Sequence, residues 1–530
     1  MYSEKKSFAY RAALAIFLVW VLPSLACNFP FAENSNRLAV ELQTTLTAMV
    51  DPGLHEPTPV PEGEVDQYLS PEGEIQSFIP TAVSIQRPIP PVLDGSGHSF
   101  TYLTASGDIL QAVAKRFAVE PNEILSAEPI PEVGLLPPGR VLMIPNQLGE
   151  LRYTEFLLPD SEVVNSPSAR DFQIEEFINA AGGYLSEHYE QVNGSFLSGA
   201  EIVRKVSLEN SINPRLLLAL LELRSGWVYG DPVDPGQLDY PIGFYVPDYK
   251  GLYYELVLTA THLGVGYYGW RSGEKTILTF QDGSVLRLSP GLNPGTVGLQ
   301  TVLSKISTQE EWRNTLYAET GFVDLYSAMF GDPWGQAAEI GDLIPADLTQ
   351  PDLLLPFAVG ERWSFTGGPH RSWNAGSPRG ALDFSPVTGE PACTTSRAWV
   401  TASAPGVVTR AGDSVLAIDL DGDGYEQTGW VLVYLHMVMP EDILPGKTIA
   451  VDEPLGHPSC ERGQSTGTHI HLARKYNGEW IQAGDPVPFM LSGWETIVGE
   501  KNYQGELHKG EQIITANPGG PSSSLITRDQ

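Results

Sequence analysis

Two histidines near the C-terminal end of the chain are spaced as a chemical site would require. His469 and His471 stand two residues apart, and the apolar residues Ile470 and Leu472 alternate with them. In a β-strand, residues i and i+2 point to the same face, so the two imidazoles would stand side by side. An imidazole can bind a metal or transfer a proton near neutral pH. The pair therefore forms half of a site, and the other half must come from elsewhere.

Three residues upstream are candidates for that other half. A zinc hydrolase needs three protein ligands and one open position for water. His370 ends a glycine-rich stretch that could expose its ring, and Asp383 lies between two apolar residues. A carboxylate in such surroundings is costly to bury unless it is paired or bound to a cation. His436 ends an apolar run and could point into the same cleft.

The segment that carries these residues, 351–496, is expected to be all-β. Its short strand-like runs alternate with turns rich in Gly, Asp and Pro, and no long helical period interrupts them. We predict an antiparallel sandwich. The segment also holds Cys393 and Cys460, a candidate disulfide beside the cleft if their Cα atoms lie within about 7 Å. Two unpaired thiols are the alternative.

The same segment resembles the M23 family of zinc metallopeptidases, the lysostaphin, staphylolysin and β-lytic group that cuts peptide cross-links in bacterial cell walls. Residues 465–471 are like the family's H-x-H strand, residues 404–412 are like its strand-turn signature, and residues 434–436 are like the part that carries its middle histidine. The likeness covers nearly the whole segment.

One departure from the family pattern concerns the first ligand. Much of the family has histidine four residues before the metal-binding aspartate, and this chain has Arg379 there. His370 instead lies 13 residues before Asp383 in a Gly-Gly-x-His turn, which looks like the longer spacing of the staphylolysin and β-lytic branch. This spacing would complete the ligand set.

The resemblance implies a role for each residue. His370, Asp383 and His471 would bind Zn²⁺, which would polarise the scissile carbonyl and bring the pKa of its water to about 7. His436 and His469 would be the catalytic groups that take the water proton, stabilise the oxyanion and protonate the leaving amine. His457 and His508 match nothing in the pattern and are expected to be structural.

Length and charge restrict the class of protein. A chain of 530 residues is too long for one core and suggests about three or four domains. Its 64 acidic and 32 basic residues give a formal charge of -32, which would repel nucleic acid and anionic lipid. We therefore expect a multidomain protein that does not bind nucleic acid.

The N-terminus is expected to direct export. Lys5, Lys6 and Arg11 precede an apolar run, 12–22, that is short for a spanning helix and typical of a signal peptide, residues 1–27. Cys27 follows a small residue and resembles the lipidated cysteine of bacterial lipoproteins. Such motifs usually have Leu three residues earlier, where this chain has Ser. Cleavage by an ordinary signal peptidase and retention as an uncleaved anchor stay open.

A stalk and a small domain are expected next. Residues 28–97 would form a helix and a Pro-rich acidic linker. Residues 98–146 show a strand, helix, helix, strand pattern with a G-D-x-L opening and an L-P-P-G-x-V-L-x-I-P ending. This pattern resembles the βααβ LysM domain and implies binding of N-acetylglucosamine-containing glycans such as peptidoglycan. A domain that packs on its neighbours and has lost its glycan groove is the alternative.

The middle of the chain is less informative. A linker, 147–170, precedes a mostly α-helical segment, 171–350. It weakly resembles a lysozyme-like transglycosylase core, but Arg224 stands where those enzymes have a catalytic glutamate. A guanidinium cannot donate that proton, and Glu222, two residues away, is a poor substitute. We expect a spacer or substrate-holding domain, and a disordered tail over 497–530.

A run of aspartates suggests a second, weaker metal site. Asp419, Asp421 and Asp423 have the spacing of a calcium loop, but Trp430 stands where an EF-hand has its bidentate glutamate. A tight hairpin turn is the preferred interpretation.

These observations together favour an exported, lipid-anchored peptidoglycan endopeptidase that depends on zinc. The LysM-like unit would hold the glycan, and the C-terminal segment would cut the peptide cross-link. A non-catalytic envelope scaffold, or an activator of another cell-wall hydrolase, is the second hypothesis. Convergence of the three ligand side chains on one point would distinguish the two.

Overall fold

The computed structural model describes residues 87–88, 92–93, 97–318, 320–463 and 465–529. The expected signal peptide, the lipidation candidate Cys27 and most of the expected stalk lie outside these residues. Among the helices that are described, none is long and apolar enough to cross a membrane.

The first described unit is a small antiparallel sheet covered by one helix. Strands β1 (Val92–Leu93), β2 (Ser99–Leu103) and β3 (Val141–Pro145) pair in that order, and α3 (Leu110–Phe117) packs on β2 and β3. The expected second helix is only the short 3-10 turn η2 (Pro121–Glu123). Its proline and asparagine favour a turn, and none of its three residues is buried.

The middle segment is helical, as expected. Its longest helix is α9 (Leu252–Arg271), which packs closely on α10 (Pro294–Lys305) because Gly266 lets the two backbones approach: an added Cβ would lie 2.7 Å from the carbonyl oxygen of Val297. The other helices are α4 (Ile174–Ala181), α5 (Tyr184–Glu187), α6 (Gly199–Asn210), α7 (Pro214–Ser225), α8 (Gly236–Asp239), α11 (Gln309–Tyr317), α12 (Phe322–Phe330), α13 (Pro333–Ile340), η3 (Asp160–Glu162) and η4 (Pro167–Ala169). Two hairpins join them, β4 (Tyr189–Val192) with β5 (Ser195–Ser198) and β6 (Ile277–Thr279) with β7 (Val285–Arg287).

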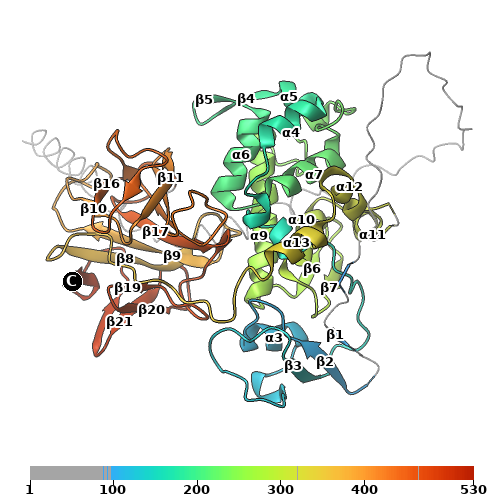
Figure 1. Ribbon diagram of the computed structural model, residues 1–530, viewed down its shortest axis with the longest axis horizontal. Coiled ribbons are helices and arrows are strands. Elements are labelled where there is room, and N and C mark those ends of the chain that lie inside the picture. The colour runs from blue at the N-terminus through green and yellow to red at the C-terminus, as the bar shows by residue number, and fades with distance from the viewer. Residues whose placement is uncertain (1–86, 89–91, 94–96, 319, 464, 530) are drawn as a thin grey trace, which may run out of the picture. The chain divides into compact units, whose positions relative to one another are not determined.

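The C-terminal segment is built on a nine-stranded antiparallel sheet. The strand order is β15-β11-β12-β13-β17-β9-β8-β23, and β18 pairs with β17. Figure 1 shows β8, β9 and β17 side by side in this sheet. The strands are β8 (Arg362–Arg371), β9 (Arg379–Pro386), β11 (Gly406–Gly412), β12 (Val415–Asp419), β13 (Trp430–Leu435), β15 (Thr448–Ile449), β17 (Ile470–Tyr476), β18 (Glu479–Trp480) and β23 (Leu525–Thr527).

Two smaller antiparallel sheets accompany it. One has the order β10 (Val400–Thr401), β16 (Pro454–Pro458) and β14 (Met437–Val438); the other runs β19 (Met490–Leu491), β20 (Trp494–Val498), β21 (Gly505–Lys509) and β22 (Gln512–Thr515). One apolar core contains residues of all three sheets. The antiparallel, sheet-rich segment was predicted correctly.

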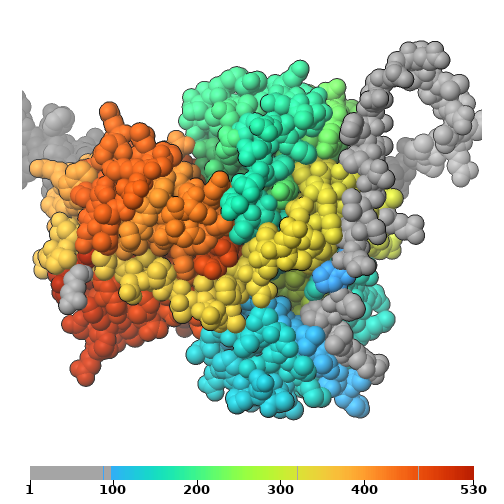
Figure 2. Space-filling view, viewed as in Figure 1, coloured from blue at the N-terminus to red at the C-terminus, as the bar shows by residue number. Residues whose placement is uncertain are grey.

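The expectation of a disordered tail over 497–530 is wrong. These residues contain the end of β20, all of β21, β22 and β23, and the turn η5 (Ser522–Ser524), and Figure 2 shows the red C-terminal residues next to yellow and orange residues of the same segment. Leu507 and Ile526 are buried in the core, and β23 pairs with β8. The guanidinium of Arg528, which is also buried, donates to the carbonyl of Phe357. In these residues, apolar side chains that stand between polar ones are sufficient to form the strands β21, β22 and β23.

Candidate metal centre

Three neighbouring strands bring the three expected ligands together. His471 in β17 lies directly opposite Asp383 in β9, and β8 pairs with the other edge of β9. The register of β8 shifts between Gly367 and His370, so the chain bulges and the His370 ring turns toward the other two side chains. Residues far apart in sequence therefore meet because strand pairing fixes their positions.

The separations of the three ligand atoms fit a tetrahedral metal site. His370 Nε2 lies 3.0 Å from His471 Nδ1 and 3.3 Å from Asp383 Oδ1, and His471 Nδ1 lies 3.4 Å from Asp383 Oδ1. Zinc bonds of about 2.0 to 2.1 Å in a regular tetrahedron place neighbouring ligand atoms about 3.3 to 3.4 Å apart. The set leaves one corner of the tetrahedron free.

Backbone carbonyls fix which ring nitrogens face this point. A carbonyl can only accept, so the contacts of His370 Nδ1 with Gly368 O (2.8 Å) and of His471 Nε2 with Ser372 O (3.1 Å) make those nitrogens the N–H donors. The facing nitrogens, His370 Nε2 and His471 Nδ1, then carry lone pairs. Outer contacts of this kind orient metal-binding histidines.

The third ligand atom is an acceptor as well. Asp383 Oδ1 is buried and has no hydrogen-bond partner among the described residues. Burial would raise the pKa of Asp383, but its interactions with the His370 and His469 rings hold it well below its usual range, so the side chain is a carboxylate. Two lone pairs and a carboxylate oxygen thus converge with no donor between them, an arrangement that a bound cation would stabilise.

The two expected catalytic histidines lie beside this set. The ring centroids of His436 and His469 are 4.5 Å apart, and His469 Nε2 is 3.7 Å from Asp383 Oδ1. His436 Nδ1 donates to Glu461 O (2.9 Å) and His469 Nδ1 to Gly467 O (2.7 Å), so each Nε2 is left to accept a proton. His436 follows β13 with a φ of 63°, a left-handed conformation that changes the chain's direction at the strand end. Burial lowers the pKa of His436 to about 4, so its ring is neutral at pH 7.

Sequence reasoning missed Tyr503. Its ring stacks on His370 with centroids 4.2 Å apart and an interplanar angle of 20°. The backbone N–H of Gly368 donates to Tyr503 O, and a Cβ on Gly368 would lie 2.6 Å from the carbonyl carbon of Gln504. The paired glycines before His370 were the available signal, because they indicate that another chain segment lies close.

Cys393 and Cys460 form the expected disulfide, with Cα atoms 4.9 Å apart. The bond joins the segment that precedes β10 to the segment that leads into β17. Thr468 Oγ1 also donates to Thr394 O (2.7 Å), which is a second link between the same two segments. The loop that carries His469 is thereby attached to the rest of the domain.

The histidines expected to be structural do lie outside the cluster. His457 contacts Ala398 O and packs against Trp399, and His508 pairs with Glu506. Arg379, which stands where much of the family has a ligand, donates to Gly499 O. It is therefore not part of the ligand set.

The transglycosylase option finds no support in the helical segment. Glu222 Oε2 accepts the backbone N–H groups of Val228 and Tyr229, so the carboxylate ties the end of α7 to the following loop. Arg224 donates to Ile242 O. Both side chains have structural partners.

The aspartates of the second candidate site also lie close together. Asp419, Asp421 and Asp423 bring carboxylate oxygens within 4.8 Å of one another in the β12–β13 turn. The two oxygens of Asp419 accept the backbone N–H groups of Asp421 and Gly424. These bonds are those of a tight turn, as preferred from the sequence.

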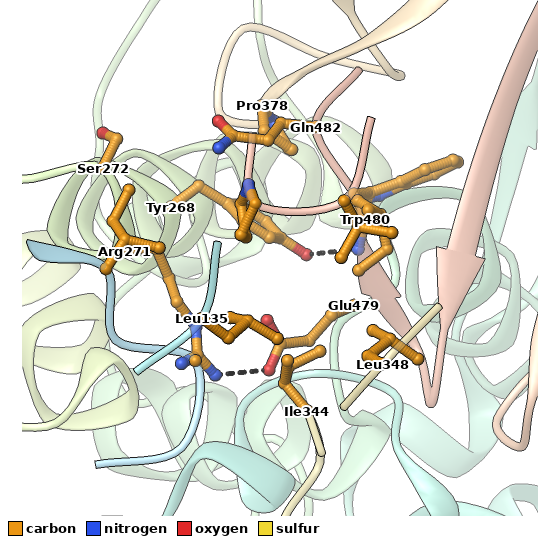
Figure 3. Close-up of a pocket in the computed structure, with 15 residues that line it drawn as sticks. Leu135, Tyr268, Arg271, Ser272, Ile344, Leu348, Pro378, Glu479, Trp480 and Gln482 are labelled. Atoms are coloured by element: carbon orange, nitrogen blue, oxygen red, sulfur yellow. Dashed lines mark hydrogen bonds and ion pairs between the residues drawn. The ribbon is translucent and has the colours of Figure 1, made fainter. Parts of the chain in front are cut away.

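One small cavity lies apart from the histidine cluster, between α9, β18 and the small N-terminal unit (Figure 3). The Arg271 guanidinium pairs with the Glu479 carboxylate at 2.6 Å, and Tyr268 Oη accepts the backbone N–H of Trp480. Because these groups are paired with one another, they connect the helical segment to β18.

Comparison with known proteins finds similar proteins for both the helical and the C-terminal segments. Residues 156–342 match the family described as LasA, N-terminal domain. Protease LasA of Pseudomonas aeruginosa is 25% identical over 389 residues, 68% of this chain and 83% of that protein. The β-lytic metalloendopeptidase of Achromobacter lyticus is 30% identical over 159 residues, 28% of this chain and 39% of that protein. The solved structure of the M23 metalloprotease pseudoalterin is 24% identical, covers 32% of this chain and 96% of its own, and has a TM-score of 0.26.

These relatives support the expected likeness to LasA-type M23 peptidases, and they confirm the expectation of a metalloendopeptidase. The family match covers most of the helical segment and begins at residue 156, inside the expected linker.

Proposed function

We propose that this chain is an exported, zinc-dependent endopeptidase that cleaves the peptide cross-links of peptidoglycan. The observation that carries the proposal is the convergence of His370 Nε2, Asp383 Oδ1 and His471 Nδ1, three acceptor atoms 3.0 to 3.4 Å apart with no donor between them. A scaffold protein would gain nothing from such a buried set of acceptors.

The three converging residues would hold the zinc. When bound, zinc supplies Lewis-acid polarisation of a carbonyl and lowers the pKa of water to about 7. His436 and His469 present Nε2 lone pairs beside the free corner, so either ring can take a proton there and, once protonated, donate it to the developing oxyanion or amine. The carbonyls of Glu461 and Gly467 keep both rings in the required tautomer.

Residues 98–146 would bind the glycan strand, as the LysM resemblance suggests. In support, Leu125, Val141 and Met143 are half exposed or more on neighbouring parts of this unit, and apolar surface of that kind can pack against sugar rings. Lipidation at Cys27 would keep the enzyme at the membrane. Binding the polymer through a separate unit raises the local concentration of peptide at the cleft.

The test uses purified peptidoglycan and the full chain. Zinc-loaded protein should release new peptide amino groups, and both a chelator and His471→Ala should abolish the release. His508→Ala is the matched control and should retain it, because His508 lies outside the cluster. Zinc-loaded protein that cleaves no type of cell wall would contradict the proposal.

A further inference from the structure

The C-terminal end of α6 in the helical segment is hydrogen-bonded to the C-terminal, sheet-rich segment. Asn210 Oδ1 accepts Asn374 Nδ2 (2.5 Å) from the loop between β8 and β9, and Ser211 Oγ donates to Gly478 O (2.6 Å). Lys475 Nζ donates to Leu208 O (3.2 Å). A short stretch of the helical segment is thus held by several points of the peptidase sheet.

Two side chains at this edge touch one another from opposite loops. The Arg462 guanidinium lies over the Trp373 ring at 5.4 Å. Trp373 follows Ser372, whose carbonyl holds His471, and Arg462 follows Glu461, whose carbonyl holds His436. The Arg462–Trp373 pair therefore lies one residue from the groups that orient two of the site histidines.

Arg462 is held in an unusual backbone conformation. Its φ is 61°, in the left-handed region that few residues other than glycine adopt. Such conformations persist where surrounding contacts impose them, and they gather at binding sites. The indole and the loop together position the guanidinium, a group that can bind a carboxylate with two parallel hydrogen bonds.

The carboxylate that Arg462 now contacts comes from α6. Arg462 Nη2 lies 2.5 Å from Glu209 Oε1, and the Glu209 side chain is only 6% exposed. Lys205 Nζ, also on α6, lies 2.8 Å from the same oxygen. Within the peptidase domain and among the described residues, the polar partners of the Arg462 guanidinium are the carbonyl of Asp413 and, at 3.4 Å, the 69% exposed carboxylate of the same residue.

A neighbouring arginine provides the contrast. Arg410 also lies over Trp373, at 5.8 Å. Its guanidinium is bound by both oxygens of Glu426, at 2.9 and 3.0 Å, and Glu426 belongs to the peptidase domain itself. Arg410 thus finds its carboxylate partner, Glu426, within the peptidase domain. The buried carboxylate that binds Arg462, that of Glu209, comes from the helical segment.

We propose that Arg462, stacked on Trp373, is a carboxylate-binding subsite of the peptidase cleft, and that Glu209 occupies it as an internal substitute for a substrate carboxylate. The ligand class is a peptide with an acidic side chain or a free C-terminal carboxylate. This inference rests on the proposed peptidase function. In a chain with 64 acidic residues against 32 basic ones, an acidic peptide needs a localised cation of this kind to approach the cleft.

The test compares peptides that differ in one charge. Glu209→Ala in the full chain removes four heavy atoms, about the size of an acetate ion, and leaves Arg462 uncovered. Calorimetry on chelator-treated protein then measures binding of tetraglycine and of tetraglycine amide. The Glu209→Ala chain should bind the acid at least about tenfold more tightly than the amide, as a charge-assisted hydrogen bond provides.

Second variants separate the possible sources of that preference. The acid-to-amide ratio should fall to about one in Glu209→Ala/Arg462→Gln and should persist in Glu209→Ala/Lys205→Gln. Asp239→Ala, which removes the carboxylate that pairs with Lys250 Nζ at 2.7 Å, is the control and should give a ratio near one. A thermal melt confirms that each variant is folded.

Equal binding of acid and amide by Glu209→Ala, or a preference that survives Arg462→Gln, would overturn the subsite and leave an ordinary interface ion pair. With zinc restored, the same preference should appear in kcat/KM for longer peptides that carry or lack the charge. A binding preference absent from kcat/KM would also overturn it. Because the calorimetry needs no hydrolysis, an inactive enzyme would refute the proposed function without deciding the subsite.

Discussion

Replacement of His370 is the most informative single change at the metal centre. Asp383 and His471 lie directly opposite each other on paired strands, whereas His370 reaches them only through a shift in the register of β8. Four-ligand zinc sites bind with apparent free energies of about 10 to 16 kcal/mol, so each ligand contributes roughly 3 kcal/mol. His370→Ala should therefore weaken zinc binding by about two orders of magnitude at 25 °C. The ring nitrogen 3.0 Å from His471 is the contact that is lost.

The assay is a competition titration against a chromophoric zinc chelator, carried out on the full chain in metal-free buffer. The His370 side chain is buried and stacked on Tyr503, so a circular dichroism melt must show that the variant is folded at the assay temperature. His508→Ala removes the same side chain from a partly exposed position and should leave the zinc affinity unchanged within about twofold. A folded His370→Ala protein that binds zinc like the parent would refute the ligand assignment.

Three further outcomes are expected. His436→Ala and His469→Ala should each retain zinc but lose about 10²- to 10⁴-fold in kcat, the usual contribution of a general acid or base; loss of the metal instead, measured by metal analysis, would make them ligands. Tyr503→Ala should weaken zinc binding by about tenfold because it releases the stacked histidine, whereas Tyr503→Phe should not, as the same chelator competition will show. The double variant Cys393→Ser/Cys460→Ser frees a loop with a sequence separation of 67, which should lower the free energy of unfolding by about 4 kcal/mol and the Tm by roughly 10 °C. An unchanged melting curve would contradict that last expectation.

The metal centre could be predicted because its signals are local. The alternation around His469 and His471 indicates a strand, and the apolar neighbours of Asp383 indicate a carboxylate that needs a partner. The likeness to a known family then supplied His370, which no local pattern connects to the others. The structure adds the reason: a register shift in β8 turns its ring toward β9.

Other features could not be read from the sequence because they depend on contacts between distant segments. Tyr503 lies in a region that reads as polar and turn-rich, and its position follows only from its pairing with Gly368. The ion pair between Glu209 and Arg462 joins residues 253 apart, and single charged residues of that kind carry no pattern in a chain rich in acidic residues. The helix expected after α3 fails because a run this short has too few internal hydrogen bonds to persist.

The central claim is that His370, Asp383 and His471 share one metal ion. Anomalous diffraction at the zinc edge, from crystals of the full chain grown with one equivalent of zinc, tests it most directly. We expect a single strong peak about 2.0 to 2.2 Å from each of the three ligand atoms. A peak at the aspartates of the β12–β13 turn instead, or none within bonding distance of His370, would contradict the account.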